Sequence, residues 1–384
     1  MKYNIWKDCP KVPITELLSF IVDNRGKTVP TADDGWKLIA TNCVTNNTLF
    51  PVYEKVRYLT QETYETWFRA HPIPGDILFV NKGTPGRVCM VPEPVDFCIA
   101  QDMIALRADD EKIYNKYLFA VLRSREIQQQ IYNTNVGDVI PHFKKQFMDQ
   151  LLIPVPDRRT QEIIGNLYFE LSYKTELNKK INNNLLEQAS SIYQAWFEDF
   201  ILSDRSCPTA WKQGTLAEIA DITSGKRPPV KSAKKTDTAI IPIVGAASVM
   251  GYTTEANHTD KILVTGRVGT HGVVQRFNLP CWTSDNTLVI TSVFYEYTFQ
   301  ILQRINYRAM NRGSTQPLIT QSDMNKVPIL IPDKETLLKF ETLVGQLMEQ
   351  YQANLLENGK LVELRDVLLP QLMSGELDVS NLCL

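Results

Sequence analysis

The sequence lacks the features that mark exported, membrane-spanning or zinc-binding proteins. No apolar run approaches the length needed to cross a bilayer, and residues 1–8 contain no apolar signal core. The 7 cysteines are scattered singly, with no Cys-x-x-Cys pair, and the 4 histidines show no zinc-ligand spacing. We therefore expect a cytoplasmic protein that has no metal site and no membrane partner.

Signatures of catalysis are missing as well. Gly26-Lys27-Thr28 resembles the end of a phosphate-binding loop, but Ile21 occupies the place of the first required glycine. The sequence contains no Gly-x-Gly-x-x-Gly motif and no Asn-Pro-Pro or Asp-Pro-Pro signature of amino-methyltransferases. We therefore predict that the chain is not an enzyme on its own and binds no cofactor directly.

Charge is low overall but uneven along the chain. The net charge of −2 conceals a basic segment, residues 208–332, with 13 Lys+Arg against 8 Asp+Glu. Residues 333–384 are acidic instead, with 4 Lys+Arg against 9 Asp+Glu. This pattern is compatible with nucleic-acid binding by globular parts that are held on a non-binding scaffold.

A long helix is the first positive feature. Residues 158–200 contain no proline, and their apolar side chains recur at three- and four-residue spacing. Such a helix would be roughly 60 Å long at about 1.5 Å per residue, so it needs a partner of similar length. Read as heptads, one predicted seam consists of Ile164, Leu171, Asn178, Leu185 and Ile192. The other consists of Leu167, Lys174, Ile181, Gln188 and Ala195.

An internal repeat supplies the partner. Residues 316–368 repeat residues 140–192 at a constant offset of 176 residues, and Asn178 matches Asn354. Two unrelated helices would make the matching asparagines accidental. Buried asparagines at seam positions cost stability, and their best-attested role is to fix the register of paired helices. The predicted pairing positions of the second helix are Leu347, Asn354, Leu361 and Leu368.

The rest of the chain forms two globular parts with one plan. In the first we expect strands at 36–40, 76–80, 87–91 and 149–155 and a helix at 112–132. Ile77-Leu78-Phe79 matches Ile262-Leu263-Val264, and Gln101-Asp102 matches Ser284-Asp285. We predict a mixed α+β fold with an internal pseudo-two-fold repeat. Two α/β domains, residues 1–156 and 208–332, are separated by long antiparallel coiled-coil-like helices within residues 157–207 and 333–384.

Each globular part contains a Gly-rich basic turn, at residues 82–87 and 266–272. Glycine lets the backbone approach a phosphate closely, and a neighbouring Arg or Lys can bind phosphate or a guanine edge. Tight turns with solvated charges are the alternative, but three matched polar or basic loops in each part favour nucleic-acid binding. The predicted DNA contacts are Arg25, Lys27, Lys82, Arg87, Lys144, Lys145, Lys226, Arg227, Arg267, His271, Arg312 and Gln316.

Three stretches carry a family resemblance. They are Ala-Trp-Phe-Glu-Asp-Phe at 195–200, Gly-Ser-Thr-Gln-Pro at 313–317, and Leu-Pro-Gln-Leu-Met-Ser-Gly-Glu-Leu at 369–377. They resemble the specificity subunits of type I DNA restriction–modification systems. The likeness covers the full chain and is more specific in the helices than in the globular parts. Gly359 inside the second helix and the short segment before Trp6 depart from the family pattern.

The resemblance implies two target-recognition domains, each reading one half of a split, asymmetric sequence in double-stranded DNA. It also implies two methyltransferase subunits that use S-adenosylmethionine to methylate adenine. Restriction subunits that use ATP and Mg²⁺ would complete the assembly. Two alternatives remain. One is a self-contained restriction enzyme or methyltransferase, which an activity assay of the purified chain would decide. The other is a coiled-coil adaptor whose globular parts bind proteins, and the absence of a steep salt dependence of DNA binding would favour it.

Overall fold

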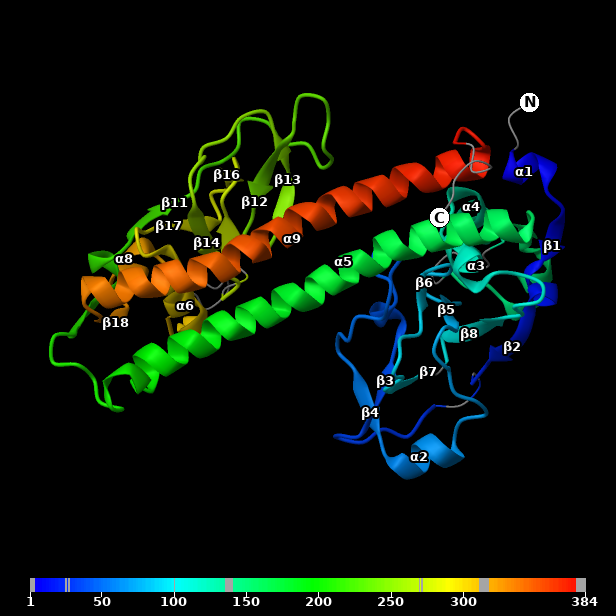
Figure 1. The fold of residues 1–384 in the computed structure, drawn as a ribbon, viewed down its shortest axis with the longest axis horizontal. Helices are drawn as coiled ribbons and strands as arrows, with labels where there is room; N and C mark the ends of the chain where they lie inside the picture. Colours follow the sequence, from blue (N-terminus) through cyan, green and yellow to red (C-terminus); the bar gives the residue numbers. More distant parts are fainter. Residues whose placement is uncertain are drawn as a thin grey trace. The chain divides into compact units, whose positions relative to one another are not determined.

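The computed structural model describes residues 4–24, 26, 28–99, 101–134, 141–268, 270, 272–310 and 318–377. The chain divides into two compact units, residues 1–180 with 354–384, and residues 181–353. Each unit holds one globule. Both long helices, α5 (Arg158–Tyr193) and α9 (Lys334–Ser374), contribute to both units (Figure 1).

The first globule is built on a four-stranded antiparallel sheet in the order β2-β8-β5-β6. A three-stranded sheet, β4-β3-β7, covers one face, and β1 pairs with β9. The strands are β1 (Lys11–Pro13), β2 (Leu18–Val22), β3 (Trp36–Ile39), β4 (Arg57–Leu59), β5 (Ile77–Val80), β6 (Val88–Met90), β7 (Phe97–Ile99), β8 (Met103–Ala108) and β9 (Leu152–Pro154). The helices are α1 (Ile5–Asp8), α2 (Gln61–Thr66), α3 (Asn115–Leu122) and α4 (Arg125–Asn133).

Strand β5 shows how the sequence divides the core of this globule. Its four residues are apolar and buried, as expected for a central strand covered on both faces. Because side chains alternate along a strand, Ile77 and Phe79 enter the core formed with α3 and α5. Leu78 and Val80 enter the core shared with the three-stranded sheet.

The second globule repeats this strand order. Its sheets are β11-β17-β14-β15, β13-β12-β16 and β10-β18. The strands are β10 (Lys212–Thr215), β11 (Asp221–Ser224), β12 (Ile241–Val244), β13 (Val249–Thr253), β14 (Ile262–Gly266), β15 (Gln275–Phe277), β16 (Trp282–Thr283), β17 (Thr287–Thr291) and β18 (Pro328–Ile331). The helices are α6 (Tyr295–Arg304), α7 (Tyr307–Met310) and α8 (Gln321–Asn325).

One buried tyrosine in each globule makes the same bond. Tyr117 of α3 donates its hydroxyl to the carbonyl of Pro154 at 2.8 Å, and Tyr297 of α6 donates to Leu330 at 2.5 Å. Pro154 and Leu330 are separated by the repeat offset of 176 residues. The prediction of a mixed α+β fold with a repeated plan is confirmed.

The two long helices begin with the same cap. Asp157 Oδ1 accepts the N–H of Thr160 at 3.0 Å, and Asp333 Oδ1 accepts the N–H of Thr336 at 2.9 Å. Each carboxylate satisfies a main-chain donor that the first turn of a helix leaves unpaired. Helix α5 then runs to Tyr193 and continues as a π-helical turn, Gln194–Glu198.

Within each unit, parts of the two helices pack against each other. In the first unit, Ile164 and Tyr168 from the start of α5 share a core with Leu369 and Leu372 from the end of α9. In the second unit, Leu185, Ala189 and Tyr193 of α5 share a core with Leu337 and Phe340 from the start of α9. The pairing is therefore antiparallel in both.

The predicted pairing residues fall into two classes. Ile164, Asn178, Leu185 and Asn354 are buried, and Leu171, Ile192, Leu347, Leu361 and Leu368 are half-buried. The other predicted seam of α5 is wrong at its three central positions, because Lys174 and Gln188 are exposed and Ile181 is 45% exposed. Leu167 and Ala195 are half-buried. The buried positions lie one residue later, at Tyr168, Thr175, Asn182 and Ala189.

The asparagines of the seam make bonds between helices. Asn178 Nδ2 donates to Glu357 Oε2 at 2.6 Å and to Asn358 Oδ1 at 2.9 Å. In the second unit, Asn182 Nδ2 donates to the carbonyl of Tyr351 at 3.1 Å. Polar bonds of this kind favour one register, because any shift along the helix would bury the amides without these partners.

Some local predictions were wrong. The single helix expected at 112–132 is two helices, because Ser124 accepts the N–H of Ile127 and starts α4 as a new helix. The closing strand begins only at Leu152, after a 3₁₀ turn over Lys145–Gln150. Helix α9 continues without a break through Gly359.

Candidate nucleic-acid interface

The ends of three strands meet at one edge of the first globule. Strands β2 and β5 both run antiparallel to β8, and Val80 lies opposite Met103. The loops that follow β2 and β5 therefore lie beside the turn that precedes β8. Segment 141–145 joins them, because Gly83 donates its N–H to the carbonyl of Pro141 at 2.9 Å. We call residues 23, 24, 26, 81–87, 101–102 and 141–145 the first loop edge.

Main-chain hydrogen bonds fix the loops of the first loop edge to one another. Asn81 donates its N–H to Asp102 at 2.9 Å and accepts the N–H of Phe143 at 2.8 Å. The buried side chain of Asn81 adds a third bond, from Nδ2 to the carbonyl of Phe143 at 3.3 Å. One asparagine thus ties three loops together, which gives the rigid support that a recognition surface requires.

A hollow of about 460 Å³ opens at the first loop edge. The sequence predicted Lys82 in its wall as a DNA contact but missed Arg69. Arg69 follows α2 and is held here because its N–H donates to Asn24 Oδ1 at 2.9 Å. No spacing in the sequence indicates this approach, since it depends on a tertiary bond. The lining residues are Asp23, Gly26, Arg69, Asn81, Lys82, Gln101, Asp102 and His142.

Basic side chains of the first loop edge face neighbouring carboxylates. Lys82 Nζ lies 4.0 Å from Asp102 Oδ1, and Lys145 Nζ lies 3.3 Å from Asp23 Oδ2. Both pairs are partly solvated, so each lysine can turn to a phosphate at small cost. Two further predicted contacts are exposed, Arg87 and Lys144. Two others, Arg25 and Lys27, lie outside the described residues.

The second globule has an equivalent edge. Strands β11 and β14 run antiparallel to β17, and Gly266 lies opposite Thr287. Arg267 donates its N–H to Asn286 at 2.8 Å and accepts the N–H of Ile319 at 3.0 Å. We call residues 224–227, 267–268, 284–286 and 318–321 the second loop edge.

The second loop edge also presents predicted contacts. Lys226 and Arg227 are exposed, and Arg267 is half-buried. The backbone of Lys226 is fixed, because its carbonyl accepts the indole N–H of Trp282 at 2.7 Å. Three predicted contacts, His271, Arg312 and Gln316, lie outside the described residues.

Main-chain bonding corrects the match between the two edges. Asn81 and Arg267 make the same pair of main-chain bonds, so they occupy equivalent positions. The matching of Ile77-Leu78-Phe79 to Ile262-Leu263-Val264 was therefore one residue out of register. Asp102 and Asn286 accept the equivalent bonds, which makes the exposed Gln101 the counterpart of the exposed Asp285. The edges share a backbone and differ in their side chains.

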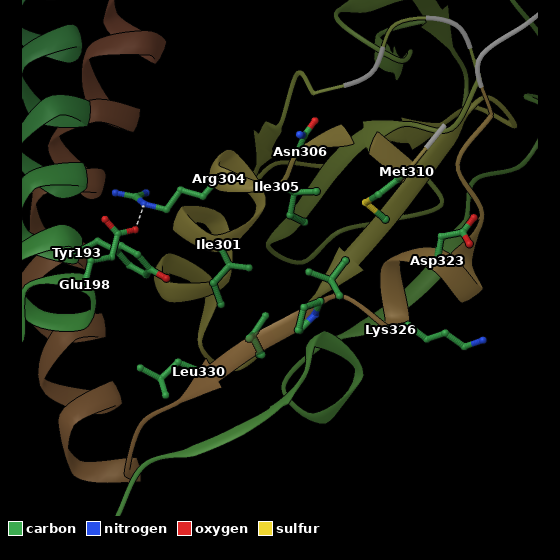
Figure 2. A pocket seen from close by; sticks show the side chains of 13 residues that line it. Tyr193, Glu198, Ile301, Arg304, Ile305, Asn306, Met310, Asp323, Lys326 and Leu330 are labelled. Atoms are coloured by element: carbon green, nitrogen blue, oxygen red, sulfur yellow. Dashed lines mark hydrogen bonds and ion pairs between the residues drawn. The ribbon is translucent and has the colours of Figure 1, made fainter. Parts of the chain in front are cut away.

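A second hollow, of about 520 Å³, lies in the second unit beside the end of α5 (Figure 2). Its walls are largely apolar, and Figure 2 shows Ile301, Ile305 and Leu330 among them. Arg304 Nε donates to Glu198 Oε1 at 2.8 Å, which ties the end of α5 to α6. A hollow of this kind is typical of packing between secondary-structure elements, and it lies outside the two equivalent loop edges.

Among the residues that the structure describes, no group of three or more His, Cys, Asp or Glu side chains could hold a metal ion. No helix within the described ranges combines the length and apolar character needed to cross a membrane.

Comparisons with known proteins give a consistent result. The sequence matches the family described as "Type I restriction modification DNA specificity domain" over residues 14–187 and 208–365. It is 26% identical to the type I restriction enzyme MjaIX specificity subunit of Methanocaldococcus jannaschii, across 70% of this chain and 71% of that protein. It is 21% identical to the HindI specificity subunit of Haemophilus influenzae, across 79% of this chain and 86% of that protein.

A solved structure shares the fold. The crystal structure of a type I restriction–modification system S subunit from M. genitalium matches with a TM-score of 0.60 and 17% sequence identity. The match covers 97% of this chain and 98% of that chain. Each of the two segments that match the family contains one globule and part of a long helix. The chain therefore belongs to the family of type I restriction modification DNA specificity domains.

Proposed function

We propose that this chain recognises a bipartite, asymmetric sequence in double-stranded DNA and directs partner subunits to it. In this proposal residues 1–156 and 208–332 are the two target-recognition domains, and each loop edge reads one half of the target. The observation that supports it best is the pair of loop edges. The two loop edges lie at the equivalent ends of two equivalent sheets, one in each globule. They differ in their side chains, as two readers of different sequences must.

The side chains of each edge suggest a division of labour. Lys82, Lys144 and Lys226 are exposed cations, suited to phosphates that fix position without reading sequence. Gln101 and Asp285 are the exposed counterparts at the tips of rigid turns. A glutamine pairs well with adenine, and an aspartate accepts a hydrogen bond from cytosine. We assign base reading to these two positions.

The long helices carry the proposed assembly. They would keep the two half-sites at a fixed separation and bind two methyltransferase subunits that use S-adenosylmethionine to methylate adenine. Restriction subunits that use ATP and Mg²⁺ would join the same complex. The chain itself is a non-catalytic component, as its membership among specificity subunits indicates.

The modified motif tests the proposal directly. The chain is produced with its methyltransferase partner, and methylated DNA is sequenced. Gln101→Asp should change one base pair of one half-site, and Asp285→Gln should change one base pair of the other half-site. A motif that is continuous, or that changes in both halves with either variant, would contradict two separate readers.

Lys144→Ala is the matched control for base reading. A phosphate contact carries no sequence information, so the motif should stay the same while affinity falls for all sequences. Log affinity falls as log salt concentration rises, and the loss of one phosphate contact should make this fall less steep by about 0.9. DNA binding with no salt dependence in the unaltered chain would favour the protein-binding adaptor instead.

A further inference from the structure

The two globules rest on the long helices at equivalent points but by different means. Helix α3 of the first globule and α6 of the second have counterpart N-termini, because Tyr117 and Tyr297 make the same hydroxyl bond. The first main-chain N–H groups of any helix lack partners within the helix. The groups that accept hydrogen bonds from these donors determine how each globule is held against its long helix.

In the first globule, α3 lies directly against the backbone of α5 at Gly165. A Cβ atom added at Gly165 would lie 2.5 Å from the main-chain nitrogen of Tyr117 and 2.9 Å from the carbonyl carbon of Lys116. Only glycine permits so close an approach. Gln161 completes the contact, because its Oε1 accepts the N–H of Tyr114 at 2.8 Å. The acceptor here is an uncharged amide, and Lys116 Nζ forms an ion pair with Glu170 Oε1 at 3.5 Å across the same junction.

In the second globule, a carboxylate occupies the equivalent place. Glu341 lies 176 residues after Gly165, the offset that relates the two helices. Its Oε2 accepts the N–H of Glu296 at 3.0 Å, and its Oε1 accepts the N–H of Tyr297 at 2.8 Å. Both oxygens of one side chain thus hold the first turn of α6, where the helix dipole favours negative charge.

We propose that Glu341 is a positioning residue that clamps the second recognition domain to α9, and that docking of this domain alone is coupled to proton binding. The coupling to reading of the second half-site rests on the function proposed above. The clamp itself rests on the two hydrogen bonds and on the difference from Gly165.

The charged groups around Glu341 define the direction of the coupling. Glu296 of α6 faces it, and Arg276 of β15 binds Glu296 through two bonds of 2.6 and 2.7 Å. Arg276 also lies over the ring of Tyr295, 4.9 Å from its centroid. Burial raises the pKa of Glu341 to about 7, and the charge of Glu296 adds to this, although the two N–H groups and Arg276 oppose it. The docked state therefore binds a proton that the undocked state releases.

The sign of the effect follows from this raised pKa. A group whose pKa is higher in the docked state favours docking fully below its undocked value and loses that contribution as the pH rises through about 7. The docking equilibrium should fall by up to about tenfold between pH 6 and pH 8. The first globule, with Gly165 at this place, should show no such change.

Hydrogen exchange of the full chain tests the clamp. Exchange rates at the start of α6 and of α3, corrected for intrinsic pH dependence, are compared from pH 6 to pH 8. Protection of the Glu296 and Tyr297 amides should fall with rising pH, while the Tyr114 amide, which donates to Gln161, keeps its own. Glu341→Gln should remove the pH dependence at α6. The same pH profile in this variant as in the unaltered chain, or at α3, would overturn the proposal.

The methylated motif tests positioning separately. With the methyltransferase partner, Glu341→Ala removes both acceptor oxygens and should relax discrimination in the second half-site by about tenfold, comparable to one lost base contact, and leave the first intact. Gly165→Ala is the mirror control and should relax the first half-site at every pH. Two unaffected half-sites in Glu341→Ala would overturn the positioning role. If the unaltered chain directs no site-specific methylation, the proposed function fails, whereas the exchange experiment still judges the clamp.

Discussion

The two globules share one frame and carry different surfaces. The order β2-β8-β5-β6 equals β11-β17-β14-β15, and the same strands end at both loop edges. At those edges Asn81 of the first globule is equivalent to Arg267 of the second, and Gln101 is equivalent to Asp285. A buried frame tolerates little change because packing is tight, whereas exposed turn residues can vary at small cost to stability. On the proposed function, the duplicated chain would thereby read two sequences with one architecture.

The largest effect should come from the cores that join each globule to the helices. Phe340 is buried, with the rings of Phe197 and Tyr193 5.1 and 6.1 Å away, and Phe340→Ala should cost about 3–5 kcal/mol. Its counterpart Ile164→Ala should cost about 2–5 kcal/mol. Hydrogen exchange should locate the first loss in β14 and the second in β5. Equal loss in both strands from either variant would show that the globules are not separate units.

The asparagine bonds should give the next largest effect. Asn178→Leu removes a donor from Glu357 and Asn358 and should cost about 1–3 kcal/mol, because a half-buried acceptor is left unpaired. Asn182→Leu removes the bond to the carbonyl of Tyr351 and should cost less, about 0.5–1.5 kcal/mol. Urea denaturation of both variants measures the difference. A more stable Asn178→Leu chain would mean that this amide serves register alone.

The helix caps should have smaller and equal effects. Asp157→Ala and Asp333→Ala should each cost about 1 kcal/mol at neutral pH. Bonds from Thr336 lower the pKa of Asp333, so its contribution is present above the unfolded pKa of about 3.9 and is lost as the pH falls through the folded value. Denaturation at pH 7 and in acid should show the deficit only at pH 7. Unequal losses of stability in the two variants would indicate that the two caps contribute differently to the free energy of unfolding.

Exposed cations should affect stability least. Lys82→Ala and Lys226→Ala should each change the free energy of unfolding by no more than about 0.5 kcal/mol. On the proposed function, each variant should make the fall of log affinity with log salt concentration less steep by about 0.9, because each would lose one phosphate contact. A change at one edge only would show that one globule dominates binding to the backbone.

The long helices and the repeat could be predicted because their signals are local or periodic. Asp157 and Asp333 start proline-free runs with helical spacing, and a constant offset needs no knowledge of the fold. The heptad register was harder. Lys174 and Ile181 were placed in the seam, whereas Thr175 and Asn182 fill it, since a helix of mixed composition fits neighbouring registers almost equally well.

The composition of the loop edges could be predicted only in part. Lys82 was predicted from charge in a glycine-rich turn, and Lys226 from a matched pair of basic loops. Arg69 was missed because the tie to Asn24 joins two loops that the sequence keeps apart. The structural equivalence of Asn81 and Arg267 was missed because insertions shift the sequence offset between the two globules. Only the main-chain hydrogen bonds of each sheet reveal the true correspondence.

The contribution of α9 to the first core has a consequence for synthesis of the chain. The core around Ile164 and Tyr168 includes Leu369, Leu372 and Met373, which are synthesised after the second unit. The second unit, residues 181–353, is continuous in sequence. On a ribosome, the second unit can close as soon as its own residues emerge, whereas the first must also wait for residues 369–373.

We therefore expect the domain made first to mature last. A chain stopped after residue 353 should keep the strands of the second globule protected from proteolysis and expose those of the first. The first globule would then become resistant to proteases later than the second, once residues 369–373 have been added.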